Sequence, residues 1–229
     1  MYRGRSRAQV AGAIDHSVLK PNSLAEEVVA AAQVAQRELT ASLCIRPIDV
    51  RVAAPLLSTV PLCTVIGFPH GTTTTAVKVF ETMEALQAGA REVDMVINSA
   101  AMAAGDYQAV QDDIAAVCAA AHGHRSDAVV KVIFETCLLS GDEQVRKCCE
   151  LAEAGGADFV KTSTGFGSAG ATVEHVKIMR ESVGARVKVK ASGGIRTLDQ
   201  LCDMLDAGAD RCGCSATESI LKEFDERAS

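Results

Sequence analysis

Apolar and polar positions follow a pattern that repeats over most of this chain. Short apolar runs rich in β-branched residues, such as positions 62–68 and 128–134, are separated by longer stretches in which apolar residues recur at helical spacing. Four of these stretches end in a glycine that leads directly into the next apolar run: Gly89, Gly155, Gly184 and Gly208. The pattern predicts alternating strands and helices, which is typical of the α/β class.

The alternation gives eight strand–helix units in one domain. We expect strands to begin near positions 13, 41, 62, 91, 129, 158, 186 and 210, with helix-start capping boxes at Ser23, Ser140 and Thr197. Eight such units in 229 residues favour a single (β/α)8 TIM barrel over residues 11–229. The alternative is a doubly wound open sheet, but its usual phosphate-binding motifs, GxGxxG and GxxxxGK[ST], do not occur. We expect residues 1–10 to form a flexible arm.

Composition narrows the range of partners and compartments. The net charge is −6 and only 3% of residues are aromatic, which argues against nucleic acid or an anionic membrane as a partner. No apolar run is long enough to span a bilayer, and no apolar core of a signal peptide follows Arg3, Arg5 and Arg7. The nine cysteines are scattered without a CxxC pair, so we expect free thiols in a reducing compartment, the cytoplasm.

Charged residues fall on the strand face that points into the predicted barrel. Side chains alternate between the two faces of a strand, and the apolar neighbours of these charges occupy the face that packs on helices. The inward positions on four consecutive strands are Asp94, Lys131, Lys161 and Lys190. Lys161 comes at the carboxyl end of its strand, where barrel enzymes hold their active sites.

The residues alone leave two interpretations of this cluster open. One is a buried ion network that only stabilises the barrel. The other starts from the excess of amines over acids, which lowers the pKa of one lysine below its usual value of about 10.4 and releases a neutral amine. A neutral Lys161 attacks an aldehyde or ketone to form a Schiff base, while Asp94 and Lys190 move protons. The poor neutralisation of three lysines favours this second interpretation.

Glycine-rich turns follow the last three predicted strands at the same end of the barrel. Loops in this place commonly bind phosphate through backbone N–H groups at a helix start. We expect phosphate contacts from Thr164, Gly165, Gly193, Gly194, Gly213 and Ser215. Further candidate substrate contacts are Asp15, Ser17, Cys44 and Lys131. The five histidines show no zinc-ligand pattern, so no metal and no cofactor is expected.

Several segments around these residues resemble the deoxyribose-phosphate aldolase family. The segments are FVKTSTGF around Lys161, VKASGGIR around Lys190, EVDMVIN around Asp94 and KVIFET from Lys131, in the family's order. The resemblance covers about residues 12–220. It implies a metal-independent, class I aldolase that reversibly cleaves 2-deoxy-D-ribose 5-phosphate to acetaldehyde and D-glyceraldehyde 3-phosphate. It also implies that Lys161 forms the Schiff base and that Asp94 and Lys190 donate and accept protons.

Two positions depart from the family's pattern. Lys188 stands where a small residue is common, two positions before the second lysine. We expect it to face inward and to pair with Glu92 lower in the barrel. Ala216 stands where a second small hydroxyl residue often follows Ser215, so we expect one phosphate contact fewer.

Other functions remain open alternatives. A transaldolase-like transferase or an isomerase would use a similar barrel and phosphate site, and an isomerase would leave Lys161 without a covalent role. A non-catalytic phosphosugar-binding barrel would use the lysines only to hold an anion. The expected partners are a small phosphorylated sugar and aldehydes. Barrels of this kind often associate through their outer helices, so we also expect a homo-oligomer, either a dimer or a tetramer.

Overall fold

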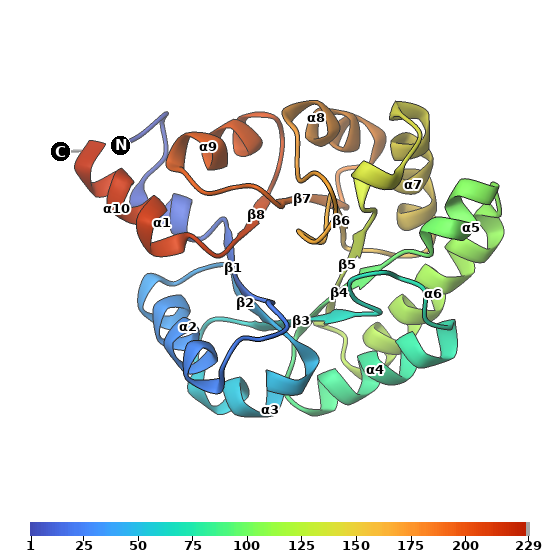
Figure 1. Ribbon diagram of the computed structural model, residues 1–229, viewed down its shortest axis with the longest axis horizontal. Coiled ribbons are helices and arrows are strands. Elements are labelled where there is room, and N and C mark those ends of the chain that lie inside the picture. Colours follow the sequence, from blue (N-terminus) through green and yellow to red (C-terminus); the bar gives the residue numbers. More distant parts are fainter. Residues whose placement is uncertain (228–229) are drawn as a thin grey trace.

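The eight predicted strands are present and close into one barrel. The computed structural model describes residues 1–227, and its parallel strands pair in sequence order until β8 returns to β1 (Figure 1). The strands are β1 (Ile14–Val18), β2 (Ser42–Ile45), β3 (Leu62–Ile66), β4 (Glu92–Val96), β5 (Val129–Ile133), β6 (Phe159–Lys161), β7 (Lys188–Ser192) and β8 (Arg211–Cys214). Each strand begins within two residues of its predicted position, which confirms the (β/α)8 TIM barrel.

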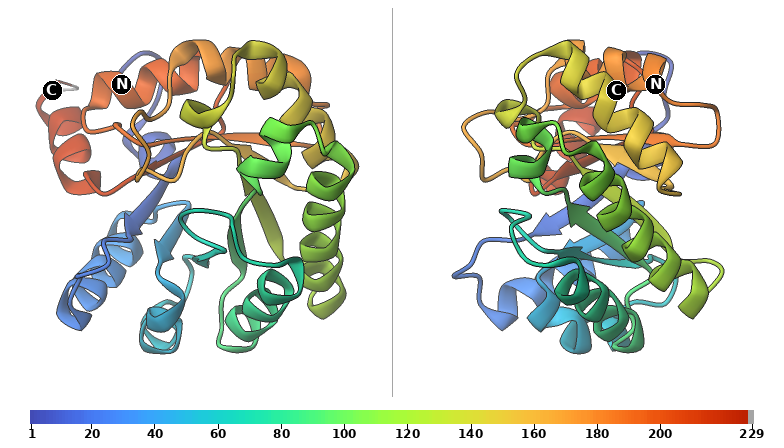
Figure 2. Two further views of the ribbon diagram at one scale, coloured as in Figure 1. Left: turned by 45° about the vertical axis from the view of Figure 1, so that its right-hand side comes forward. Right: turned by 90° about the vertical axis from the view of Figure 1, so that its right-hand side faces the viewer.

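Helices form the outer ring of the barrel, and side views show the same layering (Figures 1 and 2). The α-helices are α1 (Arg7–Ala11), α2 (Ala25–Glu38), α3 (Val50–Ala53), α4 (Thr75–Gln87), α5 (Ser99–Ala104), α6 (Tyr107–His124), α7 (Asp142–Ala154), α8 (Val173–Ser182), α9 (Leu198–Asp206) and α10 (Thr217–Arg227). Short 3-10 turns are η1 (Pro47–Asp49), η2 (Ala54–Leu56) and η3 (Thr136–Leu138). Among residues 1–227, no helix has the length and apolar character needed to cross a bilayer.

The hydrophobic core lies between the strands and the helices. Outward-facing strand residues such as Val130, Val132 and Phe134 are fully buried there. Burial of side chains of this size stabilises the fold by about 1.5–3 kcal/mol each. Because the core occupies the outer strand face, the charged residues between these positions are left to the barrel interior.

Helix-start signals are confirmed at one of the three predicted capping boxes. Thr197 caps α9 together with Gln200. The boxes at Ser23 and Ser140 are wrong, because α2 is capped at Leu24 and α7 at Gly141. Each of these helices begins with acidic residues in its first turn, which stabilise the exposed N–H groups without a serine cap.

The N-terminal residues, where the sequence predicts a flexible arm, form a short helix and contacts with the rest of the barrel. Ser6 caps α1, which packs against α10. Before it, Arg3 lies 2.6 Å from Asp203 and Arg5 lies 2.7 Å from Asp206, both carboxylates being on α9. Both ends of the described chain lie beside this surface (Figure 1). These ion pairs hold the N-terminal segment against α9. The sequence pattern does not predict them, because the acidic partners lie about 200 positions further along the chain.

Candidate active site

Asp94 on β4 gathers the three predicted lysines at the centre of the barrel. Its carboxylate is fully buried, and Lys131 lies 2.8 Å from its Oδ1. Lys161 and Lys190 each place Nζ 2.7 Å from the other oxygen, Oδ2. The strand register explains the meeting, since Lys131 pairs with Asp94 and Lys190 pairs with Lys161 on neighbouring strands. The predicted cluster of one acid and three amines is therefore present.

A second layer of charges lies beneath this cluster. Glu92 forms ion pairs with Lys131 at 2.6 Å and with Arg211 at 2.8 Å. Asp15 lies 2.5 Å from Lys190 and 3.2 Å from Arg211. The interior thus holds four cations and three carboxylates among the described residues, and Arg211 is a member that the sequence analysis did not identify.

The expected pairing of Lys188 with Glu92 is wrong. Lys188 is exposed at the first position of β7, and its Nζ lies 5.7 Å from the centre of the Phe159 ring. Arg211 of β8 takes the place beside Glu92 instead. The difference arises because β7 begins only at Lys188, so this side chain stays at the rim while Arg211 reaches inward.

The electrostatics of the cluster separate Lys161 from the other two lysines. Burial opposes the charged form of Lys190, but Asp15 and Asp94 outweigh it and raise the pKa of Lys190. Burial likewise opposes ionisation of Asp94, but the three lysines outweigh it and hold its pKa well below the usual range. Lys131 has Asp94, Glu92 and Asp15 beside it, whereas Lys161 has only Asp94 as a carboxylate partner in the described chain.

A cavity of about 670 Å³ reaches the lysine cluster from the carboxyl ends of the strands. Lys161 and Lys190 lie at its floor, and Ser17 and Cys44 line its wall as candidate substrate contacts. Asp15 and Lys131 are fully buried and do not line the cavity. Their side chains form ion pairs with Lys190 and Asp94, and their contact with substrate stays a prediction.

Backbone turns form one side of the same cavity. Gly165, Gly193, Gly194, Gly213 and Ser215 all line it, as predicted for a phosphate site. Gly193 and Gly194 have φ angles of +84° and +83°, a conformation that glycine adopts without steric cost. Gly170 approaches so closely that a Cβ there would lie 2.1 Å from the carbonyl oxygen of Gly193. These glycines let two loops meet at the cavity.

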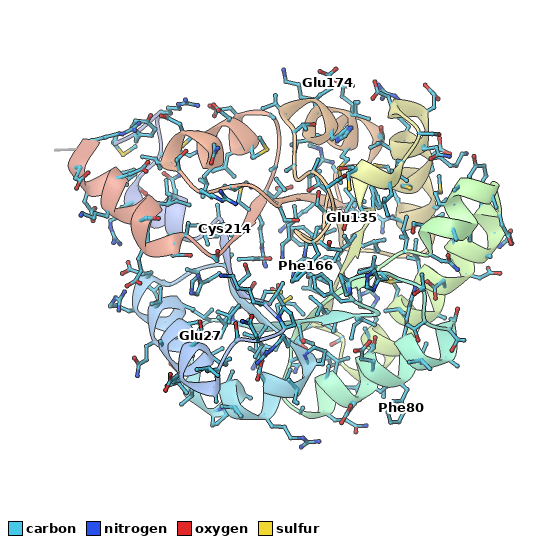
Figure 3. All side chains as sticks on the ribbon, in the orientation of Figure 1. Glu27, Phe80, Glu135, Phe166, Glu174 and Cys214 are labelled. Atoms are coloured by element: carbon cyan, nitrogen blue, oxygen red, sulfur yellow. The ribbon has the colours of Figure 1, made fainter. Side chains whose placement is uncertain are left out.

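Thr164 lines the cavity and is held by Glu135, a residue to which the sequence analysis gave no role. The Thr164 hydroxyl donates to one carboxylate oxygen of Glu135, and its backbone N–H lies 3.4 Å from the other. Phe166, in the same loop, packs edge-to-face on Phe68 with 5.3 Å between ring centres. Figure 3 shows Phe166 and Glu135 toward the middle of the ring of helices. Strand alternation places Glu135 inward, but only the fold shows its contact with this loop.

Cys44, Cys63 and Asp94 are the described residues whose side chains come close enough to share a metal ion, within 4.8 Å of one another. Cys63 donates to Asp94 over 3.2 Å, and Lys131 donates to Cys63 over 3.3 Å. A hydrogen bond from Cys63, together with the nearby lysines, lowers the pKa of Cys44 against the effect of burial. The ammonium groups occupy both oxygens of Asp94, so a divalent cation would have to displace them.

Comparison with known proteins agrees with this geometry. Residues 9–216 match the model of the DeoC/LacD family aldolases. A deoxyribose-phosphate aldolase of Bacillus mycoides is 51% identical over 214 residues, covering 93% of this chain and 94% of the relative. One from Carboxydothermus hydrogenoformans is 48% identical over 219 residues, covering 95% and 96%.

Solved structures agree as well. A tetrameric deoxyribose phosphate aldolase from Aeropyrum pernix superposes with a TM-score of 0.87 at 31% identity, covering 97% of this chain and 93% of that chain. The match of the family model covers residues 9–216, a span that contains the lysine cluster and the glycine-rich loops. The chain belongs to the DeoC/LacD family of aldolases.

Proposed function

We propose that this protein is a class I deoxyribose-phosphate aldolase, a lyase that reversibly cleaves 2-deoxy-D-ribose 5-phosphate to acetaldehyde and D-glyceraldehyde 3-phosphate. The observation that carries the proposal is Lys161 at the cavity floor, sharing one oxygen of Asp94 with Lys190. The names of relatives about half identical to this chain support the substrate. The cavity joins this amine to glycine-rich turns suited to a phosphate.

Lys161 supplies the nucleophile in this proposal. Its Nζ adds to C1 of the open-chain sugar, and loss of water gives a protonated Schiff base. The iminium accepts the electron pair of the C2–C3 bond as a proton leaves the C3 hydroxyl. This step releases D-glyceraldehyde 3-phosphate and leaves an enamine on Lys161. Protonation of C2 and addition of water then release acetaldehyde and restore the free amine.

Asp94 and Lys190 move the protons of these steps. Lys161 must lose a proton before it attacks, and Asp94 Oδ2 lies within hydrogen-bond distance of its Nζ. Lys190 touches the same oxygen and keeps its own charge through Asp15. The positive charge of Lys190 stabilises negative charge that develops on the substrate oxygens.

The phosphate of the substrate binds at the turns that follow β6, β7 and β8. Backbone N–H groups around Gly193, Gly194 and Gly213 approach the anion closely because no Cβ stands in the way. Ser215 adds a hydroxyl at the start of α10, and Thr164 and Gly165 complete the opposite side. These contacts place C1 of the sugar at the lysine end of the cavity.

Compartment, cofactor use and assembly belong to the same proposal. All nine cysteines are free, which suits a reducing compartment such as the cytoplasm. The iminium is itself the electron sink, so the reaction needs no metal or organic cofactor. We also propose that the chain self-associates, an idea supported by the tetrameric relative from Aeropyrum pernix.

A coupled assay tests the reaction. Purified protein is given 2-deoxy-D-ribose 5-phosphate, and both released aldehydes are measured with and without a chelator. We expect equal amounts of the two products, no loss of activity with chelator, and no turnover by Lys161→Leu. Lys188→Leu, at an exposed lysine outside the cavity, is the matched control and should retain activity. Turnover by Lys161→Leu would contradict the Schiff-base mechanism and favour an isomerase.

A further inference from the structure

Two cysteines lie side by side on the inner wall of the barrel. Cys44 is on β2 and Cys63 is on the neighbouring strand β3, and the register of the two strands pairs one directly with the other (Figure 1). Neighbouring strands lie about 4.7–4.9 Å apart, and disulfides bridge Cα atoms about 4.4–6.8 Å apart. The two Sγ atoms lie within 4.8 Å of each other. A small movement of the side chains therefore brings the two sulfurs into bonding distance.

The two thiols differ in their surroundings. Cys44 is buried but lines the cavity that reaches the lysine cluster, so a molecule as small as hydrogen peroxide can approach its sulfur. Cys63 does not line the cavity, and its sulfur lies between Asp94, 3.2 Å away, and Lys131, 3.3 Å away. Cys44 is therefore the thiol that an incoming reagent meets first, and Cys63 is the thiol that is joined to the buried charges.

The charges around Cys44 favour the thiolate, which is the form of cysteine that reacts with peroxides. A hydrogen bond from Cys63, together with the positive charge of the nearby lysines, lowers the pKa of the Cys44 thiol against the opposing effect of burial. Cys214 lines the same cavity, but burial raises the pKa of its thiol to about 11. Of the two thiols on the cavity wall, Cys44 is thus the more reactive.

We propose that Cys44 and Cys63 form a site of reversible oxidation, at which a hydroperoxide converts the two thiols into a disulfide that joins β2 to β3. With hydrogen peroxide, the Cys44 thiolate attacks one oxygen and the O–O bond breaks, which gives a sulfenic acid on Cys44 and a hydroxide ion. The sulfur of Cys63 then attacks the Cys44 sulfur, so that an S–S bond forms and water leaves. The hydroxide takes up the proton that Cys44 lost. Two thiols and one peroxide thus give one disulfide and two water molecules.

The disulfide changes the contacts of Asp94. A sulfur in a disulfide carries no proton, so Cys63 no longer donates a hydrogen bond to Asp94. It is also a weak acceptor for Lys131. We therefore expect the carboxylate to move relative to Lys161 and turnover to fall. The bond itself forms without any aldolase reaction, but its effect on turnover rests on the proposed function.

Peptide mapping of the full chain tests the site without reference to activity. The protein is treated with a few equivalents of hydrogen peroxide, unfolded in an alkylating reagent and digested without a reductant. We expect a peptide pair linked through Cys44 and Cys63, in a protein about 2 Da lighter than before, and its loss on addition of dithiothreitol. Cleavage of 2-deoxy-D-ribose 5-phosphate should fall at least about tenfold as the link forms and should recover with dithiothreitol.

Two variants test the roles of the cysteines, each compared with the same variant before peroxide. Cys63→Ser keeps a hydroxyl that can donate to Asp94 but cannot form the bond. Its Cys44 should stop at the sulfenic acid, which dimedone traps, whereas the wild type should give little dimedone adduct. Cys137→Ser removes the most exposed of the nine thiols and is the control. It should be linked and inactivated like the wild type.

The outcomes separate this site from the proposed function. Treated wild type with Cys44 and Cys63 both alkylated and unlinked would overturn the site, whatever its activity. A linked protein with full turnover would overturn the effect on Asp94, and inactivation that Cys137→Ser prevents would overturn the assignment to Cys44. A chain that forms the link but cleaves no sugar before treatment would support the site and contradict the aldolase reaction alone.

Discussion

Lys161 and Lys190 donate hydrogen bonds to the same atom, Oδ2 of Asp94, each over 2.7 Å. The two nitrogens are therefore no farther apart than twice that distance. Two ammonium groups at this separation inside a buried site repel each other strongly unless carboxylates compensate them. Lys190 has a second carboxylate, that of Asp15, and Lys161 does not. Lys161 is thus the amine of this pair with fewer carboxylate partners in the described chain, and it is the one that lines the cavity beside the glycine-rich loops.

Replacing Asp94 by asparagine should damage both catalysis and stability. The amide removes the one negative charge shared by three buried lysines, which we expect to cost about 3–5 kcal/mol of unfolding free energy. It also removes a proton acceptor, so kcat should fall about 10²–10⁴-fold. Urea denaturation and steady-state kinetics measure the two effects.

Asp15→Asn is the matched comparison for Asp94→Asn. Asp15 is equally buried but pairs with Lys190 and not with Lys161, so the stability loss should be similar and the fall in kcat smaller. Equal losses of kcat in the two variants would indicate that Asp94 acts only by holding charge in place.

The proposed phosphate site predicts a change in substrate preference when a negative charge is placed at Gly194. Gly194→Asp should raise KM for 2-deoxy-D-ribose 5-phosphate at least about tenfold, because the carboxylate repels the phosphate. KM for unphosphorylated 2-deoxy-D-ribose should change little. Gly194→Ala controls for the strain of a side chain at φ +83°, where a Cβ meets no atom within 4 Å. An equal rise in KM for both sugars in Gly194→Asp would indicate that the phosphate does not bind at this loop.

His16 predicts how stability depends on pH. Burial lowers its pKa to about 4, and its Nδ1 lies 2.8 Å from the hydroxyl of Thr217. Above about pH 6.5 both folded and unfolded states hold a neutral imidazole, so the group has no effect. Between about pH 6.5 and 4 the His16 imidazole is protonated in the unfolded state but stays neutral in the folded state. The free energy of unfolding therefore decreases as pH falls. The total loss is about 3 kcal/mol.

Denaturant unfolding at several pH values measures this decrease. His16→Gln should remove most of it, after a pH-independent loss of about 1 kcal/mol for the bond to Thr217. His124→Gln makes the same substitution at an exposed histidine and should keep the slope of the parent. A parent protein whose stability is constant between pH 4 and 6.5 would contradict the prediction.

Much of the fold and the centre of the site can be predicted from the sequence, because side chains along a strand alternate between its two faces with a period of two residues. That period placed Asp94, Lys131 and Lys161 inward once their apolar neighbours were assigned to the core. The alternation of strands and helices, together with the glycine junctions, gave the barrel and the place of its active end. Neither inference needs a long-range contact.

Contacts between distant segments could not be predicted in the same way. Arg211 lies in a four-residue strand whose inward phase is fixed only by its register with Lys190. The exposed place of Lys188 follows from where β7 begins, and the roles of Glu135 and Asp15 follow from loops and strands meeting across the barrel. In each case the partner is set by the closure of the barrel.

Trapping the Schiff base tests the central claim most directly. The protein is incubated with one equivalent of acetaldehyde and reduced with borohydride, and the lysine that carries the new ethyl group is located by peptide mass spectrometry. We expect the ethyl group on Lys161, with loss of activity in proportion to labelling, and no label on Lys190. An unmodified Lys161, or a label on Lys190 with Lys161 free, would contradict the assignment of Lys161 as the nucleophile.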